Sequence, residues 1–346
     1  MKKLLFIAGV MCLFASCSKE FKGAKVERAF YYWAADNDLD SDNQDRLNEI
    51  KVQKLYVKYF EVDYNQTMGD FPFSKTQLRD YSIQNIKDLT IIPTVFIKNE
   101  IFKFNSDKEL EVLADNIVFL IDKYSKENFE KEITNTEIQI DCDWTASTKD
   151  KYFYLLKKIK QKANRTLSCT LRLYPYRYDD AMGVPPVDKA TLMCYNLIKP
   201  LSDKDKNSIL DYGELKKYMN RSTPYPLHLD IALPIFFWSH LYQNHQFSGL
   251  LTMNTDQLKS FTKRIHPMWY EVTKDTVLNY DQYLRVGDKI KCEEVSNATL
   301  QKTIDLLKSK LNFDDTVTIS LFHANDNALQ QFTNEEITSF YDSFTK

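Results

Sequence analysis

The sequence predicts an α/β protein folded as a (β/α)8 TIM-type barrel, and three observations support this fold class. Short apolar segments of strand length recur along the chain, each followed by a helical or long polar segment, as is typical of parallel strands joined by helices. Eight such segments occur, and eight favour closure into a barrel over an open sheet. No repeat or low-complexity linker follows residue 26, so we expect one barrel domain over residues 27–346.

The segment before the barrel has the features of an export signal. Met1-Lys2-Lys3 is basic, residues 4–14 are apolar, and Ala15-Ser16-Cys17 ends the run with small residues before a cysteine. This ending resembles the lipobox of bacterial lipoproteins, which implies cleavage before Cys17 and diacylglycerol on its sulfur. We therefore expect a signal peptide over residues 1–16, a tether over 17–26, and a chain anchored to a lipid bilayer of the bacterial cell envelope, periplasmic or surface-exposed. An ordinary secretory signal with a chance cysteine is the alternative.

The predicted elements alternate in order along the chain. The strand candidates are Ala29–Ala35, Lys54–Glu61, Leu89–Ile97, Glu137–Asp143, Thr166–Tyr174, Thr191–Asn196, Leu227–Phe236 and Val317–Leu321. The helix candidates are Ser41–Ile50, Lys75–Lys87, Lys108–Tyr124, Ser147–Ala163, Leu210–Met219, Asp256–Arg264, Ala298–Leu311 and Asn334–Phe344. Two further extended segments, Trp269–Asn279 and Tyr283–Glu293, predict a small β-hairpin insertion between strands seven and eight.

The fourth strand candidate presents acids on one of its faces. With a period of two, Ile138, Ile140 and Cys142 share the outward, apolar face, whereas Asp141 and Asp143 point inward. An inward carboxylate must be solvated by a cleft, paired or protonated, because burying an unpaired charge is too costly. The sequence therefore predicts either a functional cleft or a structural pair of acids that binds an interior arginine.

The other strands supply partners for these acids. Catalytic groups of this fold come from the carboxyl ends of strands, where we expect one cleft to gather Asp141, Asp143, Arg172, Tyr174, Tyr195 and Asp230. The alternative is an interior polar network in which Arg172 neutralises an aspartate and nothing reacts.

Composition narrows the partners and the chemistry. The formal net charge of −2 offers no basic excess to neutralise phosphates, so nucleic acid is not an expected partner. Cys142, Cys169 and Cys194 fall on the apolar parity of their strands and are expected to be small buried hydrophobic residues. The chain lacks Gly-x-Ser-x-Gly, His-Glu-x-x-His and a phosphate-binding glycine loop, so we expect no cofactor and no metal.

Three motifs together resemble glycoside hydrolase family 18. The stretch Asp141-Cys142-Asp143-Trp144-Thr145 is similar to the end of that family's fourth-strand motif, Asp-x-x-Asp-x-Asp-x-Glu, in which Asp141 and Asp143 match the second and third acids. Leu192–Asn196 resembles the sixth-strand Met-x-Tyr-Asp, with Met193 and Tyr195 matching and Asn196 in place of the acid. Ala232–Phe237 resembles the seventh-strand Gly-Leu-Pro-x-Tyr. The resemblance implies a barrel that acts on glycans.

The departures from this pattern limit what the resemblance implies. Thr145 stands where the family has the glutamate that protonates the leaving oxygen, and Ile138 stands in place of the first aspartate. If the chain is an enzyme, it is expected to be a glycosidase that uses Asp141 and Asp143 with an acid from another strand: Asp230, Glu61 or Asp63. If it is not, it is a glycan-binding or structural lipoprotein. In either case the expected ligand contacts are Tyr195, Arg172, Tyr174, Trp144 and Met193. A metal-binding Asp-x-Asp of a glycosyltransferase is a third, more distant interpretation.

Overall fold

The computed structural model describes residues 23–34, 39–129, 136–278 and 282–345. The predicted signal peptide, Cys17 and most of the tether lie outside the described residues. Within the described part of the chain, every helix is too short or too polar to cross a membrane.

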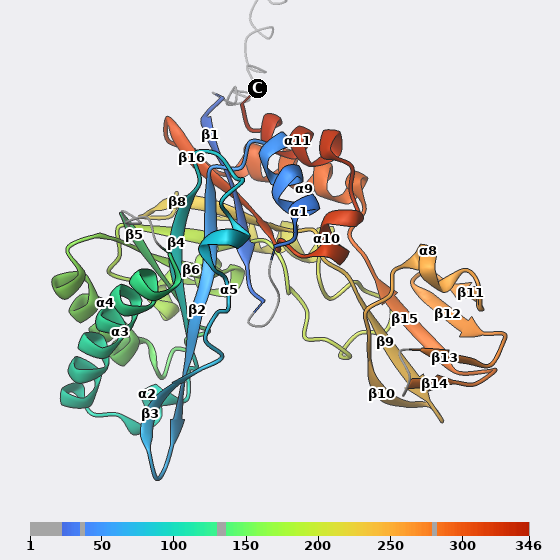
Figure 1. Ribbon diagram of the computed structural model, residues 1–346, viewed down its shortest axis with the longest axis horizontal. Coiled ribbons are helices and arrows are strands. Elements are labelled where there is room, and N and C mark those ends of the chain that lie inside the picture. Colours follow the sequence, from blue (N-terminus) through green and yellow to red (C-terminus); the bar gives the residue numbers. More distant parts are fainter. Residues whose placement is uncertain (1–22, 35–38, 130–135, 279–281, 346) are drawn as a thin grey trace, which may run out of the picture.

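Eight parallel strands close into a barrel, as the sequence predicts (Figure 1). The barrel closes because the first strand, β1, pairs in parallel with both β2 and β16. The strands, in the order in which they lie around the barrel, are β1 (Lys25–Tyr32), β2 (Lys54–Asn65), β4 (Thr90–Ile97), β5 (Glu137–Asp141), β6 (Thr166–Arg172), β7 (Lys189–Met193), β8 (His228–Pro234) and β16 (Thr316–Phe322).

Helices cover the outside of the barrel, and side chains of their flanking residues fix where several of them begin. Ser106 and Glu109 form a reciprocal cap at the start of α3, and Ser296 caps α9. In chain order the helices are α1 (Ser41–Glu49), α2 (Ile101–Phe104), α3 (Asp107–Asn128), α4 (Lys149–Ala163), α5 (Leu173–Arg177), α6 (Asp179–Met182), α7 (Tyr212–Tyr218), α9 (Asn297–Lys310), α10 (Asp326–Gln330) and α11 (Asn334–Asp342).

The helix expected over Lys75–Lys87 is wrong. Strand β2 continues past its expected end and turns back at Gly69 into an antiparallel strand, β3 (Gly69–Phe73). The chain then returns with only a short 3-10 helix, η1 (Asp80–Ser82), although Leu78 and Ile86 are buried as the apolar spacing suggests. Side chains form hydrogen bonds with backbone groups that would otherwise be paired within a helix. For example, the side-chain oxygen of Asn48 accepts a hydrogen bond from the backbone N–H of Lys87 at 2.9 Å.

The insertion after β8 is larger than the expected hairpin. It forms a five-stranded antiparallel sheet with its own apolar cluster, and it projects from the side of the barrel (Figure 1). The helix expected over Asp256–Arg264 ends at Leu258, because the residues from Thr262 pair with the next strand instead. The elements are β9 (Trp238–Gln243), β10 (Gln246–Leu251), α8 (Thr255–Leu258), β11 (Thr262–His266), β12 (Trp269–Val272), β13 (Thr276–Leu278), β14 (Gln282–Leu284) and β15 (Lys289–Glu293).

A buried ion pair holds this insertion against the loop that follows β7. The Lys291 ammonium lies 2.6 Å from the Glu293 carboxylate, and both side chains are inaccessible to solvent. Lys291 also donates to the carbonyls of Asp203 and Lys206, each at 2.7 Å, and Glu293 accepts a hydrogen bond from the Trp238 indole at 2.6 Å. Protein groups therefore compensate both charges.

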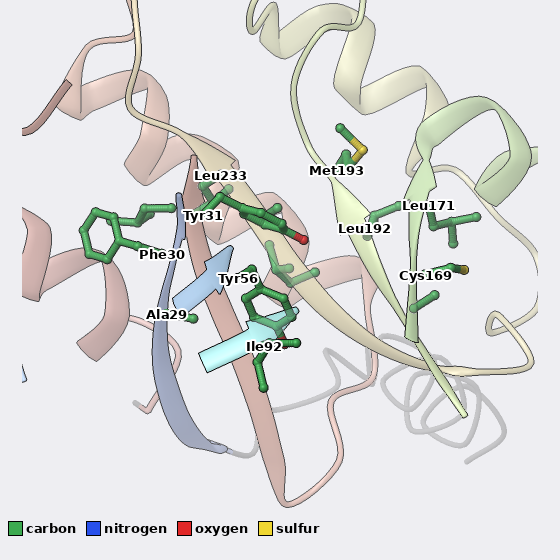
Figure 2. Packing of buried hydrophobic residues seen from close by; sticks show 14 of the residues in the cluster. Ala29, Phe30, Tyr31, Tyr56, Ile92, Cys169, Leu171, Leu192, Met193 and Leu233 are labelled. Carbon is green, nitrogen blue, oxygen red and sulfur yellow. The ribbon is translucent and has the colours of Figure 1, made fainter. Parts of the chain in front are cut away.

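The barrel interior is polar and aromatic, whereas the space between strands and helices is apolar. Figure 2 shows the rings of Tyr31 and Tyr56 together inside the barrel, with Phe30 directed away from them. The Tyr31 hydroxyl donates to Gln139 at 2.8 Å, which confirms the inward parity of the fourth strand. Cys142, Cys169 and Cys194, on the opposite parity, are buried and free, as expected.

Candidate functional site

Asp141, at the end of β5, and Asp143, two residues later, lie at the carboxyl end of the barrel but in different environments. Asp141 is the last residue of the strand, is buried, and accepts a hydrogen bond from the Thr170 hydroxyl of β6. Burial, assisted by the negative charge of Asp143, raises the pKa of Asp141 to about 6. Asp141 is therefore a carboxyl that changes its protonation state close to neutral pH.

Asp143 lies outside the strand and is paired. The Arg172 guanidinium, at the end of β6, binds both of its oxygens, through Nε to Oδ1 and through Nη2 to Oδ2 at 2.7 Å. The Asp143 side chain is 47% exposed and that of Arg172 is 38% exposed, so the pair lies at the surface. The sequence left open whether Arg172 would neutralise an aspartate, and in the structure it does so for Asp143 at the rim rather than inside the barrel.

A pocket of about 320 Å³ opens beside this ion pair. The chain after β5 forms one wall and the α5–α6 segment after β6 forms the other. The Trp144 ring stacks on Tyr152 at 5.2 Å between centroids, and its indole nitrogen donates to the Met182 carbonyl at 3.3 Å, so its position is fixed. The lining residues are Cys142, Asp143, Trp144, Thr145, Ala146, Arg172, Tyr174, Pro175, Ala181 and Met182. Four expected site residues, Asp143, Trp144, Arg172 and Tyr174, therefore share one pocket.

Thr145, at the position of the family's acid, takes part in a local hydroxyl network. Its Oγ1 lies 2.9 Å from the Ser147 hydroxyl and 3.1 Å from the Thr148 hydroxyl. Thr148 in turn donates to the Asn99 amide oxygen at 2.6 Å. These contacts order the chain before α4. A threonine hydroxyl cannot replace a carboxylic acid in proton transfer.

Aromatic side chains occupy the centre of the barrel mouth. Tyr195 is buried, and its ring centroid lies 5.1 Å from that of Phe322 and 6.0 Å from that of Phe236. Burial raises the pKa of the Tyr195 hydroxyl, which is therefore a neutral donor. Trp33 lies 5.9 Å from Phe322 and remains partly exposed. Met193, the last residue of β7, is buried among the strand ends.

Two of the candidate acids for proton donation are paired with lysines. A β-bulge in β2 between Lys58 and Phe60 shifts the strand register, and the Lys58 ammonium lies 2.5 Å from the Glu61 carboxylate. The charge of Glu61 still acts on Asp141, which places it on the mouth side of the barrel. Asp63 pairs with Lys98 at 2.5 Å, and the Lys98 hydrogen bond lowers the Asp63 pKa.

Asp230 does not join this group, and its expected place at the mouth is wrong. It is the third residue of β8, near the amino end of the strand, where Lys189 lies 2.9 Å from it and 2.8 Å from Glu137. His228 adds a contact at 3.1 Å. Burial alone would raise the Asp230 pKa, but the His228 hydrogen bond and the Lys189 charge outweigh it and hold the pKa at about 2. Asp230 is therefore part of a buried polar network at the opposite end of the barrel.

A run of aromatic contacts, which was not among the predicted site features, leads from the mouth onto the insertion. From Phe236 the ring contacts continue to Trp238 at 5.5 Å, His240 at 5.7 Å and Phe247 at 6.0 Å. Trp238, His240 and Tyr242 alternate along β9 and share one face of the sheet. That period of two was the signal available in the sequence. Among the described residues, no group of three or more His, Cys, Asp or Glu side chains is arranged to hold a metal ion.

Comparison with known proteins finds likeness in structure alone. No protein-family model matches the chain, and no curated protein matches its sequence. The spore cortex-lytic enzyme SleL of Bacillus megaterium QM B1551 superposes with a TM-score of 0.57 at 13% identity, over 94% of this chain and 76% of that enzyme. A chitinase from Chromobacterium violaceum gives 0.54 at 10% identity, over 89% and 98% of the two chains. The chitinase-like agglutinin RobpsCRA from Robinia pseudoacacia gives 0.51 at 10% identity, over 92% and 99%.

These likenesses extend over nearly the whole chain and include both enzymes and an agglutinin. At such low identity they establish the arrangement of strands and helices and carry no activity with them. Together with the eight-stranded parallel barrel, they confirm the fold that the three motifs predict. The chain is thus a TIM-type (β/α)8 barrel, similar in fold to SleL and to these chitinases.

Proposed function

We propose that this protein binds glycans through the pocket beside Asp143 and Arg172 and does not hydrolyse them. The observation that carries the proposal is Thr145, whose hydroxyl is engaged with Ser147 and Thr148 where a proton-donating carboxyl would be needed. Asp143 is also neutralised by Arg172 and is not available as a free carboxylate. The agglutinin RobpsCRA has a similar fold, and its name describes agglutination and not cleavage.

The pocket offers the groups that recognise a sugar ring. Its volume of about 320 Å³ falls at the lower end of the range of small-ligand sites. The ring of Tyr174 can cover an apolar sugar face, and the Asp143 and Arg172 pair supplies both acceptors and donors for hydroxyl and amide groups. Trp238, which is partly exposed, and Phe247, which is 44% exposed, offer further aromatic surface on the insertion to a longer chain.

Calorimetric titration with chito-oligosaccharides tests the proposal. We expect saturable binding by the wild type and its loss in Arg172→Met, with the melting temperature of the variant little changed because the ion pair is at the surface. Lys98→Met is the matched control, since it removes a lysine that is 35% exposed and paired with Asp63 on another strand. Equal binding by wild type and Arg172→Met would refute this placement of the site.

Hydrolysis is the second candidate function, and one observation favours it. Asp141 has a pKa of about 6 and lies within the electrostatic influence of Glu61, so a proton donor near neutral pH exists close to Asp143. Product analysis after long incubation with chito-oligosaccharides decides between the two. Shorter products that Asp141→Asn fails to generate would establish hydrolysis in place of simple binding.

We also propose that the chain is a lipoprotein of the bacterial cell envelope, anchored through acylated Cys17. The support is the order of basic, apolar and small residues before that cysteine. Changing Cys17 to Ser should release the protein from the membrane fraction of its native host, because the acyl chains would be its lasting apolar attachment. A variant that stays wholly membrane-bound would contradict the proposal.

A further inference from the structure

We infer that exposed tyrosines in α5 and directly after it extend the pocket, so that the ligand is an oligosaccharide whose chain leaves the pocket over α5. This inference rests on the proposed glycan-binding function and deepens it by naming a multi-ring ligand and its path. The residues concerned, Tyr174 and Tyr178, are here called the tyrosine shelf.

The tyrosine shelf is continuous with the pocket because Tyr174 belongs to both. Tyr174 lines the pocket, and its ring centroid lies 4.8 Å from that of Tyr178. The two residues are four positions apart, a spacing that places side chains on the same side of a helical segment. The two tyrosines thus form one pair of rings at the edge of the pocket.

The exposure of these rings distinguishes them from the rest of the aromatic core. Tyr174 is 53% exposed and Tyr178 is 46% exposed, whereas Tyr176 between them is buried and covered by the Arg221 guanidinium at 5.2 Å. A neighbouring pair of large exposed rings beside a pocket is a common mark of a ligand surface. Packing alone does not account for it, since the segment already buries Leu173 and Tyr176.

The chemistry of the shelf favours a sugar chain over an apolar partner. Each tyrosine presents an apolar face and a polar hydroxyl, which matches the alternating CH faces and hydroxyl rims of pyranose rings. Arg177 lies 5.6 Å from the Tyr178 ring and adds a partly exposed donor at the edge of the shelf. A ring held in the pocket by Asp143 and Arg172 would therefore have its neighbours in the chain lying over Tyr174 and Tyr178.

The test compares how affinity grows with chain length. Titration of the full chain with chito-oligosaccharides of one to six units should show affinity increasing with length for the wild type. In Tyr178→Ala the gain from short to long chains should shrink by roughly 2- to 10-fold, because one aromatic contact is lost. Tyr178→Phe should keep most of the gain, since it retains the ring. Tyr81→Ala, which removes a ring that is 56% exposed elsewhere on the surface, should keep all of it.

The outcomes separate this inference from the function on which it rests. A wild type that binds with the same affinity at every length, or a Tyr178→Ala variant with an undiminished gain, would overturn the shelf and leave the pocket in place. A wild type that binds no oligosaccharide of any length would overturn the glycan-binding function itself, and the shelf with it. If Tyr178→Ala instead abolishes binding of a protein partner in a purified complex while glycans do not bind, the shelf is a protein interface and the inference is wrong.

Discussion

Removing the lysine at the amino end of the barrel should destabilise the protein more than any change at the mouth. Lys189 lies 2.8 Å from Glu137 and 2.9 Å from Asp230, and the side chains of all three are at most 14% exposed. In Lys189→Met the two carboxylates remain buried without the ammonium group that contacts both of them. Breaking a buried pair by removing one partner typically costs about 3–5 kcal/mol, and we expect the free energy of unfolding at pH 7 to fall by that amount.

The pH dependence gives a second, independent signature. In the wild type the Asp230 pKa is about 2 against an ordinary value of 3.8, so its pairing contributes about 2 kcal/mol of stability above pH 4, which is lost as the pH falls toward 2. In Lys189→Met the buried carboxylates lack their cation and their pKa values rise. Acidification from pH 7 to pH 5 should therefore stabilise the variant more than the wild type, which responds over this range through Asp141, whose pKa is about 6.

Denaturant unfolding at pH 7 and pH 5 measures both effects. Lys160→Met is the control, because that lysine pairs with Asp188 at 2.6 Å with both side chains more than 40% exposed, and its removal should cost less than about 1 kcal/mol. A Lys189→Met variant within 1 kcal/mol of the wild type at pH 7, or one with the same pH slope, would refute the account of a buried compensated network.

Three further changes test the mouth and the layers of the barrel. Asp141→Asn should stabilise the protein by about 1–3 kcal/mol at pH 7 and not at pH 4. The reason is that the raised pKa of Asp141 penalises the ionised carboxylate only as the pH rises through about 6. An equal difference in stability between variant and wild type at both pH values would contradict this. Asp143→Asn should lower the free energy of unfolding by less than about 1 kcal/mol, since its pair with Arg172 is exposed, and a loss of several kcal/mol in thermal or chemical unfolding would place that pair in the interior. Mass-spectrometric thiol labelling should find Cys142, Cys169 and Cys194 unreactive until the protein unfolds. Rapid labelling of these cysteines in the native protein would argue against their burial.

Local patterns were sufficient to predict the barrel, because each of its strands carries an apolar face with a period of two. The parity of the fourth strand was correct as well: Gln139 and Asp141 point inward and Cys142 points outward. Only part of the insertion could be predicted from the sequence. Its strands are short and bury one face against each other, so their apolar pattern depends on how they pair. The helix expected after β2 failed for a related reason, because its apolar positions pack without helical backbone bonds.

The site shows where sequence reasoning reaches its limit. The alternation of residues along the strand assigned Asp230 to the barrel interior correctly. That alternation does not show at which end of the barrel Asp230 lies, which depends on its position along the strand and on its pairing with Lys189. The pairing of Glu61 with Lys58 depends on a β-bulge, an extra residue that no periodicity predicts. The pocket itself depends on the turn after Asp143 and on the short helices after β6, whose geometry is set by contacts such as that between Trp144 and the Met182 carbonyl.

The buried pair of Lys291 and Glu293 has a consequence for the kinetics of recognition. Both residues belong to β15, so turning the insertion relative to the barrel would have to break the hydrogen bonds from Lys291 to the carbonyls of Asp203 and Lys206. Hydrogen bonds to a charged group contribute about 1.5–3 kcal/mol each, so fewer than roughly one molecule in a hundred would be in such an opened state at equilibrium. The insertion and the barrel mouth thus form a preorganised surface, and a ligand should associate in a single phase whose rate rises linearly with concentration, without a slow closing step.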